Sequence, residues 1–155
     1  MTPRQSATLR AIRAILLATL VLGLVGTLIE LYLLEHTEDV AQRIPIFLIA
    51  AALIVLVWHA FDRQALAVRA LQGTMGAFMA AGALGVMLHY RGNVEFELEL
   101  HPGSMGGGLF LEALMGATPT LAPGTMIQLG LVGLAYTFRH PFLKPSTEDG
   151  ATVQE

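Results

Sequence analysis

The sequence predicts an all-α integral membrane protein, a four-helix transmembrane bundle with a short re-entrant or interfacial helix before the last span. Three observations predict this class. The 155 residues are 54% hydrophobic and only 14% charged, whereas an ordinary soluble domain is about 25% charged. The mean hydropathy is +0.62. The apolar residues also form blocks that are too long for a small globular core, so the solvent of this fold is lipid.

The composition also excludes several function classes. The chain has no cysteine, which excludes a disulfide scaffold and any thiol chemistry. Its net charge of −3 is opposite in sign to that of a basic nucleic-acid-binding module. The expected surroundings are therefore the lipid bilayer, together with a homo-oligomer or a partner in a membrane complex, and no nucleic acid.

Residues 11–35 form the first predicted span. The apolar block extends about 36 Å as a helix, enough to cross a hydrocarbon layer of about 30 Å. A signal peptide is the alternative, because Arg4 and Arg10 precede the block and Arg13 lies at its start. The block is longer than the apolar region of a signal peptide, and no small-residue cleavage site follows it, so we favour a span.

Residues 38–61 and 73–90 form the second and third predicted spans. At the start of the second span, Thr37, Glu38 and Asp39 are typical of an N-cap followed by an acidic first turn. The third span carries small residues at four-residue spacing, which let helix backbones approach closely. This strip indicates packing inside the bundle, with homodimerisation as the alternative. Its members are Gly73, Ala77, Ala81 and Gly85.

The last predicted span, residues 125–139, is short. Thr125 and Gln128 have the spacing of a capping box, which puts the start of this helix near Met126. A helix of about 20 Å needs help to cross a membrane, and residues 105–117 supply it as the interfacial or re-entrant helix. Residues 1–140 thus form one transmembrane domain, followed by a polar tail, residues 141–155.

The basic residues orient the chain. With four crossings and the N-terminus inside, seven of the nine basic residues lie on the inner side, which is the positive-inside pattern. Both termini are therefore expected in the cytoplasm, with the protein in the inner membrane. The outer side collects most of the carboxylates. The inner basic residues are Arg4, Arg10, Arg13, Arg63, Arg69, Arg139 and Lys144.

Histidines and carboxylates on the outer side suggest a metal site. Glu95, Glu97, Glu99 and His101 alternate with apolar residues, so in an extended strand they would share one face. Carboxylate and imidazole together are a ligand set for a divalent transition metal. The alternative is ordinary solvated side chains. The candidate ligands are Glu35, His36, His89, Glu97, Glu99 and His101.

Glu30 lies inside the first span, one turn from its outer end. A carboxylate in a span is costly and normally faces the bundle interior or water. Glu30 is therefore a candidate cation or proton site, or a side chain that reaches back to the interface.

The leading functional hypothesis is an acidic, histidine-bearing pocket on the outer face that binds a divalent metal, or a role as a membrane subunit of a larger assembly. A metal-dependent membrane enzyme using Glu35, His36, His89 and His101 is one alternative. A cation- or proton-coupled transporter acting as an oligomer through Glu30 is another. The sequence contains no nucleophile elbow, P-loop or dinucleotide-binding fingerprint, so no catalytic residue is assigned.

Overall fold

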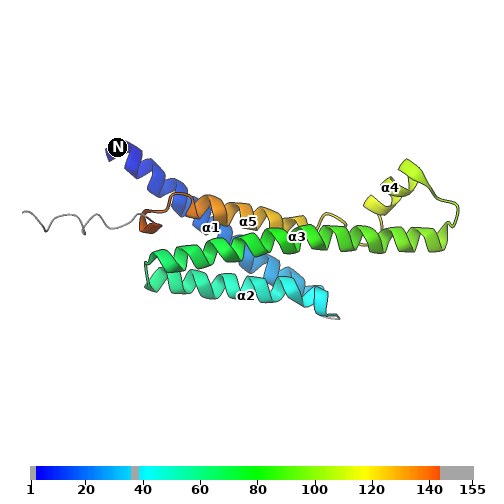
Figure 1. Ribbon diagram of the computed structural model, residues 1–155, viewed down its shortest axis with the longest axis horizontal. Coiled ribbons are helices and arrows are strands. Elements are labelled where there is room, and N and C mark those ends of the chain that lie inside the picture. The colour runs from blue at the N-terminus through cyan, green and yellow to red at the C-terminus, as the bar shows by residue number, and fades with distance from the viewer. Residues whose placement is uncertain (1–2, 36–38, 144–155) are drawn as a thin grey trace, which may run out of the picture.

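The fold is entirely helical over the residues that the structure, a computed structural model, describes: 3–35 and 39–143 (Figure 1). Within these ranges there is no strand. The helices are α1 (Pro3–Leu33), α2 (Val40–Phe61), α3 (Ala65–Leu100), α4 (Gly106–Leu114) and α5 (Gly124–Thr137), followed by a 3-10 turn, η1 (Pro141–Leu143).

Three of these helices, α1, α2 and α3, are long and apolar enough to cross a membrane. The all-helical class predicted from the sequence is therefore confirmed, together with three helices that could span a bilayer. α5 has 14 residues and extends about 21 Å, which is shorter than a hydrocarbon layer of about 30 Å.

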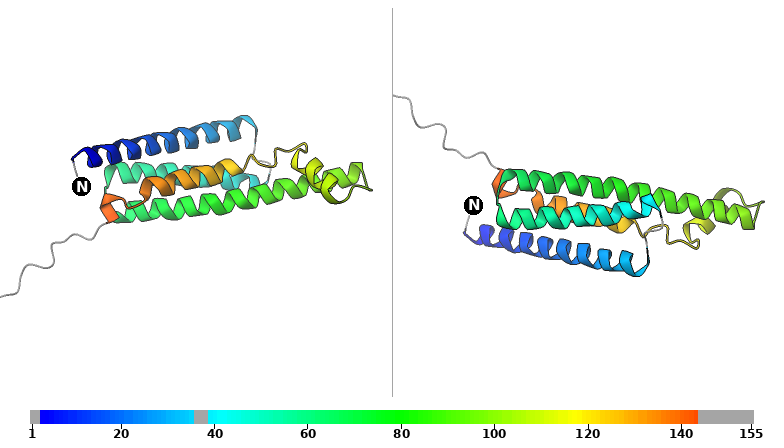
Figure 2. Two further views of the ribbon diagram at one scale, coloured as in Figure 1. Left: turned by 90° about the horizontal axis from the view of Figure 1, so that it is seen from above. Right: turned by 90° about the horizontal axis from the view of Figure 1, so that it is seen from below.

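α3 is the central helix of the bundle. α2 packs along one side of it, and α5 lies between α3 and α1 (Figure 2). The core where they meet consists of fully buried side chains from α1, α2 and α3, together with residues of α5. Its largest members are Leu20, Leu24, Ile49, Leu71, Met75 and Phe78.

Glycines allow α3 and α5 to approach closely. A Cβ added at Gly130 would lie 2.8 Å from the backbone oxygen of Met75, and one added at Gly82 would lie 2.9 Å from that of Pro123. Larger side chains cannot occupy these positions unless the two backbones separate. The short α5 helix is thus held in the bundle by backbone contact.

The small-residue strip predicted on α3 is divided between two surroundings. A Cβ on Gly85 would meet the ring of Pro123, while one on Gly73 would have no neighbour within 4 Å. Ala77 is exposed and Ala81 is half-buried. The face of α3 that meets α5 is therefore rotated from the predicted strip toward Gly82.

The extended strand considered for residues 93–101 is wrong, because α3 continues as a helix to Leu100. The residues that alternate in polarity along this segment also fit a helix, in which Asn93 is buried and Glu97 is half-buried. A lone strand has no partner for its backbone groups, whereas a helix satisfies them internally. Pro102 follows and ends the helix.

The helix starts differ from the predicted caps at both α2 and α5: Asp39, predicted in an acidic first turn after the N-cap, is itself the N-cap, while Thr37 and Glu38 lie outside the described residues. The Asp39 carboxylate accepts a hydrogen bond from the backbone N–H of Gln42 at 2.8 Å.

The capping box predicted at Thr125 is wrong, since α5 begins at Gly124 without a side-chain cap. A tight turn before the helix supplies backbone hydrogen bonds instead. The N–H of Gly124, for example, donates to the backbone oxygen of Leu121 at 2.9 Å.

Candidate functional site

The candidate metal ligands do not gather in one place among the residues that the structure describes. Glu35 is exposed at the end of α1, and His36 lies outside the described residues. The Nδ1–H of His89 donates to the backbone oxygen of Pro119 at 3.2 Å. His89 is thus directed toward the segment that leads into α5.

Glu97, Glu99 and His101 lie further along α3, about 12 Å or more beyond His89 at 1.5 Å per residue. Glu97 pairs with His101 across one helical turn, at 3.5 Å, while Glu95 pairs with Arg91 at 3.8 Å. In the helix these acids alternate between opposite faces, because every second residue is rotated by about 200°. The helix therefore separates the groups that a strand would have aligned.

No three histidine, aspartate or glutamate side chains within residues 3–35 and 39–143 form a group that could hold a metal ion. Glu30 is exposed on α1, one turn before the helix ends at Leu33. The candidate site residues that the structure describes are thus dispersed. Two other features of the molecule, an arm and a pocket, are formed by clusters of packed side chains.

The first of these features is an arm formed by residues 91–121, in which α4 folds back on the end of α3. Asn93, only 1% exposed, holds the arm together through its side-chain amide. Its Nδ2 donates to the backbone oxygens of Ala113 at 2.9 Å and Thr118 at 2.8 Å. Its Oδ1 accepts from the N–H of Thr118 at 3.1 Å.

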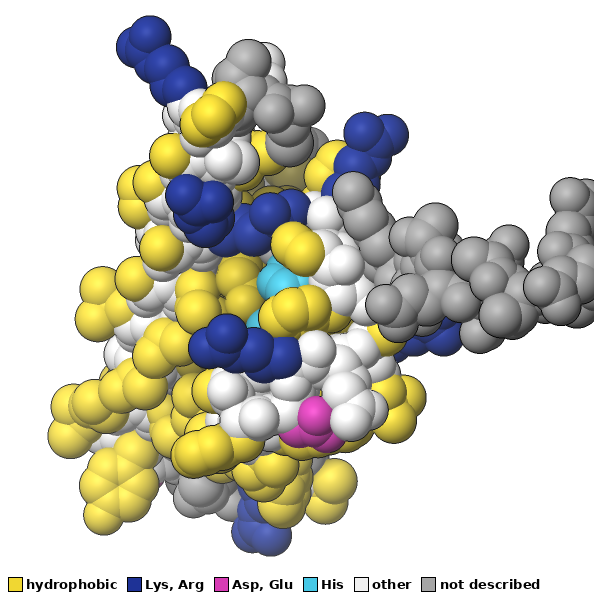
Figure 3. Space-filling view, turned by 90° about the vertical axis from the view of Figure 1, so that its left-hand side faces the viewer, with side chains coloured by type: hydrophobic (Ala, Val, Ile, Leu, Met, Phe, Trp, Pro, Cys, Tyr) yellow, Lys and Arg dark blue, Asp and Glu magenta, His cyan; other side chains and the backbone are white. Residues whose placement is uncertain are grey.

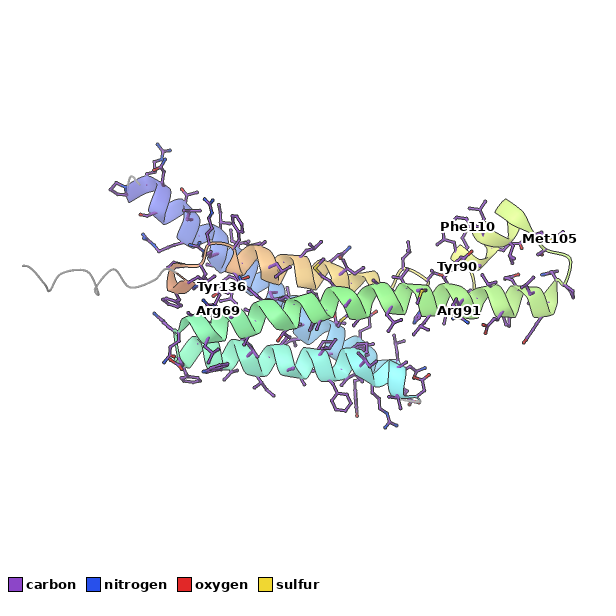
Figure 4. All side chains as sticks on the ribbon, in the orientation of Figure 1. Arg69, Tyr90, Arg91, Met105, Phe110 and Tyr136 are labelled. Carbon is purple, nitrogen blue, oxygen red and sulfur yellow. The ribbon has the colours of Figure 1, made fainter. Side chains whose placement is uncertain are left out.

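Further contacts of Thr120 and of an aromatic pair stabilise the arm. The Thr120 hydroxyl lies 2.9 Å from Asn93 Nδ2 and donates to the Ala113 oxygen at 3.1 Å. The rings of Tyr90 and Phe110 pack with their centroids 5.8 Å apart, and both residues are labelled in Figure 4. A buried amide with this many partners fixes one arrangement of the loop, because leaving any partner unpaired is costly.

The arm carries large apolar side chains on its outer surface. Met105 is 82% exposed and Met115 is 77% exposed, and Met105 lies at the far tip of the arm (Figure 4). Exposed acids lie among them on both helices. The exposed apolar members are Phe96, Leu98, Leu100, Met105, Phe110, Leu111, Met115 and Leu121, and the exposed acids are Glu95, Glu99 and Glu112.

The second of these features is a pocket of about 420 Å³ at the opposite end of the bundle. At this basic end lie the start of α1, the turn between α2 and α3, and η1 (Figure 1). Arg10, Arg13 and Arg63 lie around the pocket, and His59 and His140 line it. Figure 3 looks onto this end and shows histidine in a hollow between basic side chains.

Aromatic rings form the inner wall of the pocket. His59 Nε2 and the Tyr136 hydroxyl are joined by a hydrogen bond of 2.8 Å, and the His140 ring packs edge-on against His59 with centroids 5.2 Å apart. Burial, followed by the neighbouring His59 and the Arg13 guanidinium, lowers the pKa of His140 to about 4. His140 is therefore neutral at pH 7.

A turn after α5 brings His140 to this place. Arg139 has a φ of 46°, a left-handed conformation that is uncommon for a residue with a side chain. Arg13 Nη2 donates to the backbone oxygens of Phe138 at 3.4 Å and Arg139 at 3.0 Å. The first helix thereby anchors the carbonyls at the end of the last one, where a cation is favourable.

Sequence reasoning missed this pocket, although it placed the three arginines on one side of the membrane. His59 and His140 are 81 positions apart, and they meet only because α2 and α5 run in the same direction and end at the same end of the bundle. The available signal was that His59 at the end of α2 and His140 after α5 both fall on the basic side of the predicted topology.

Comparison of the chain with protein-family models, with curated proteins and with solved structures finds no significant match.

Proposed function

We propose that this protein is a multi-pass membrane subunit that presents the arm, residues 91–121, to a partner protein in a larger assembly. The observation that carries the proposal is the exposed apolar surface of the arm beyond the other helices. α3 has 36 residues and extends about 54 Å, against a hydrocarbon layer of about 30 Å.

The charged residues of the arm support its place outside the hydrocarbon. Arg91, Glu95 and Glu99 are exposed along the last turns of α3, and charged side chains at such depth in a bilayer are strongly disfavoured. Leu111 on α4 and Met115 at its C-cap face the same aqueous layer. Lipid does not cover them there, and exposed apolar surface in water is typical of an interaction site.

The orientation of the chain belongs to the same proposal. The basic end, with both termini, faces the cytoplasm, and the arm lies on the other side, as the positive-inside pattern favours. α5 is a fourth, shortened crossing in this arrangement, because Leu129 and Gly130 are buried against α1 and α3. The carboxylate at Glu30 then lies near the outer interface.

Site-specific photocross-linking in cells tests the proposal. A photoreactive amino acid replaces Leu111 or Met115 on the arm, or Leu22 on α1, which is 75% exposed and serves as the lipid-facing control. We expect a discrete adduct from both arm positions and none from the control. An adduct of twice the mass of the chain identifies the partner as a second copy.

The absence of any discrete adduct from the arm positions, in cells where the variant accumulates at normal levels, overturns the proposal. The substitutions themselves are mild, because both arm side chains are more than half exposed, and exposed positions rarely affect stability by more than about 0.5 kcal/mol.

A further inference from the structure

The pocket at the basic end, opposite the arm, combines three features that together describe a ligand. It has guanidinium groups at its rim, a buried polar atom without a partner in its lining, and apolar walls along two helices. None of these features is needed by the proposed role of the arm.

The rim is cationic. Arg10 and Arg63 are exposed and form no ion pair with a carboxylate among the described residues. Arg13, which is half-buried, is held in place by the carbonyls after α5. The lining contains no aspartate or glutamate within the described part of the chain. Positive charge concentrated in a hollow with low-dielectric walls attracts anions.

The lining contains an unsatisfied group. His59 is only 7% exposed, and its Nδ1 is buried without a hydrogen-bond partner among the residues that the structure describes. Its other ring nitrogen is bonded to Tyr136. A buried polar atom of this kind costs free energy, and a polar ligand in the pocket is one way to recover it.

The walls are apolar and continue into the membrane-spanning helices. Ala14 and Leu17 of α1 face Leu56 and Ala60 of α2 across the pocket. One and two turns separate Leu17 from Arg13 and Arg10, so the polar rim grades into apolar wall along the axis of α1. An amphiphile with an anionic head and an apolar tail has the same gradient.

We propose that this pocket binds a phosphate group at the membrane surface, with Arg10, Arg13 and Arg63 as its hydrogen-bond donors. Guanidinium groups match phosphate in charge and in donor geometry. The group is carried by an anionic lipid or by a soluble phosphate. The apolar walls favour the lipid, and the anionic cytoplasmic leaflet offers it on the side where basic residues are retained.

Binding to the purified full chain in nanodiscs tests the site. The nanodiscs contain phosphatidylcholine with or without phosphatidic acid, and inorganic phosphate is titrated separately. Retained lipid is counted by native mass spectrometry. The informative variant is Arg10→Gln with Arg63→Gln, which leaves the anchoring residue Arg13 intact. The matched control is Arg4→Gln with Arg69→Gln, which removes the same charge from exposed positions at the same end but outside the lining.

We expect the pocket variant to lower the affinity for phosphatidic acid by roughly tenfold or more, and the control variant to leave it nearly unchanged. Inorganic phosphate that binds as tightly, with the same dependence on Arg10 and Arg63, identifies the soluble source and retains the site. An equal loss in both variants indicates diffuse surface attraction and overturns the proposal. Wild-type protein that binds neither probe overturns it as well.

Discussion

Asn93 is the single side chain on which the arm depends most. Replacing it by Asp keeps the shape but puts an acceptor oxygen opposite the oxygens of Ala113 and Thr118, which now receive its N–H groups. We expect a loss of roughly 1–3 kcal/mol, as for other buried groups left unpaired. Hydrogen exchange of residues 113–121 should accelerate. Glu95→Gln, exposed on the same helix, is the control and should change neither quantity.

His140 makes stability dependent on pH. Its folded pKa is about 4, below the value of about 6.5 for a free histidine, so between these values the unfolded chain binds more protons. Stability therefore falls as the pH falls from about 6.5 to 4, by up to about 3 kcal/mol. His59 and Arg13, which face His140, oppose its protonation.

Thermal unfolding in detergent at several pH values measures this effect. His140→Gln has no proton to gain at this position, so its stability should decline less between pH 7 and pH 4 than that of the wild type. Titratable groups away from His140 are common to both chains and cancel in the comparison, whereas His59, which contacts His140, is released from its repulsion in the variant. Parallel profiles for the two proteins would contradict the assignment.

Between helices, the contact of α3 with α5 depends on the absence of side chains. Gly130→Ala places a Cβ about 2.8 Å from the backbone oxygen of Met75, and backbone cannot yield as a flexible side chain does. We expect a loss of roughly 1–3 kcal/mol, the usual cost of overpacking. Gly73→Ala on α3, with no neighbour within 4 Å, should be nearly neutral. Melting temperatures in detergent measure both, and equal values would place α5 away from α3.

The sequence predicts the helical elements well where apolar content decides them. α1, α2 and α3 follow from long apolar blocks, since lipid requires helices that satisfy their own backbone. The end of α3 was predicted less well, because Glu95, Glu97 and Glu99 fit a period of two as well as a helix. What decides is Asn93, whose partners at Ala113 and Thr118 lie on a segment that folds back from 20 or more positions away.

Over the whole molecule, the positions of functional groups were harder to predict than the elements. The sequence placed charges on two sides of a membrane but could not show which of them converge. Glu97 and His89 share the predicted outer side, yet α3 holds them far apart. His59 and His140 become neighbours only through the path of α5. Convergence is set by helix packing and by backbone turns such as the one at Arg139, which no local pattern records.

The orientation of the whole molecule gives the last prediction. Because the chain has no cysteine, single cysteines introduced at exposed turns report their side without background. Gln64→Cys lies at the basic end, and Gly103→Cys lies at the tip of the arm. We expect a membrane-impermeant maleimide to label Gly103→Cys in intact spheroplasts and Gln64→Cys only after permeabilisation, because basic residues are retained in the cytoplasm.

The unsubstituted chain should remain unlabelled and controls for other reactions of the reagent. The reverse pattern, with Gln64→Cys labelled from outside, would place Arg10, Arg13 and Arg63 against the outer leaflet. The anionic lipids of the cytoplasmic leaflet would then be out of reach of the pocket, and the arm would meet its partner in the cytoplasm. Labelling therefore decides which compartment supplies the ligand of one end and the partner of the other.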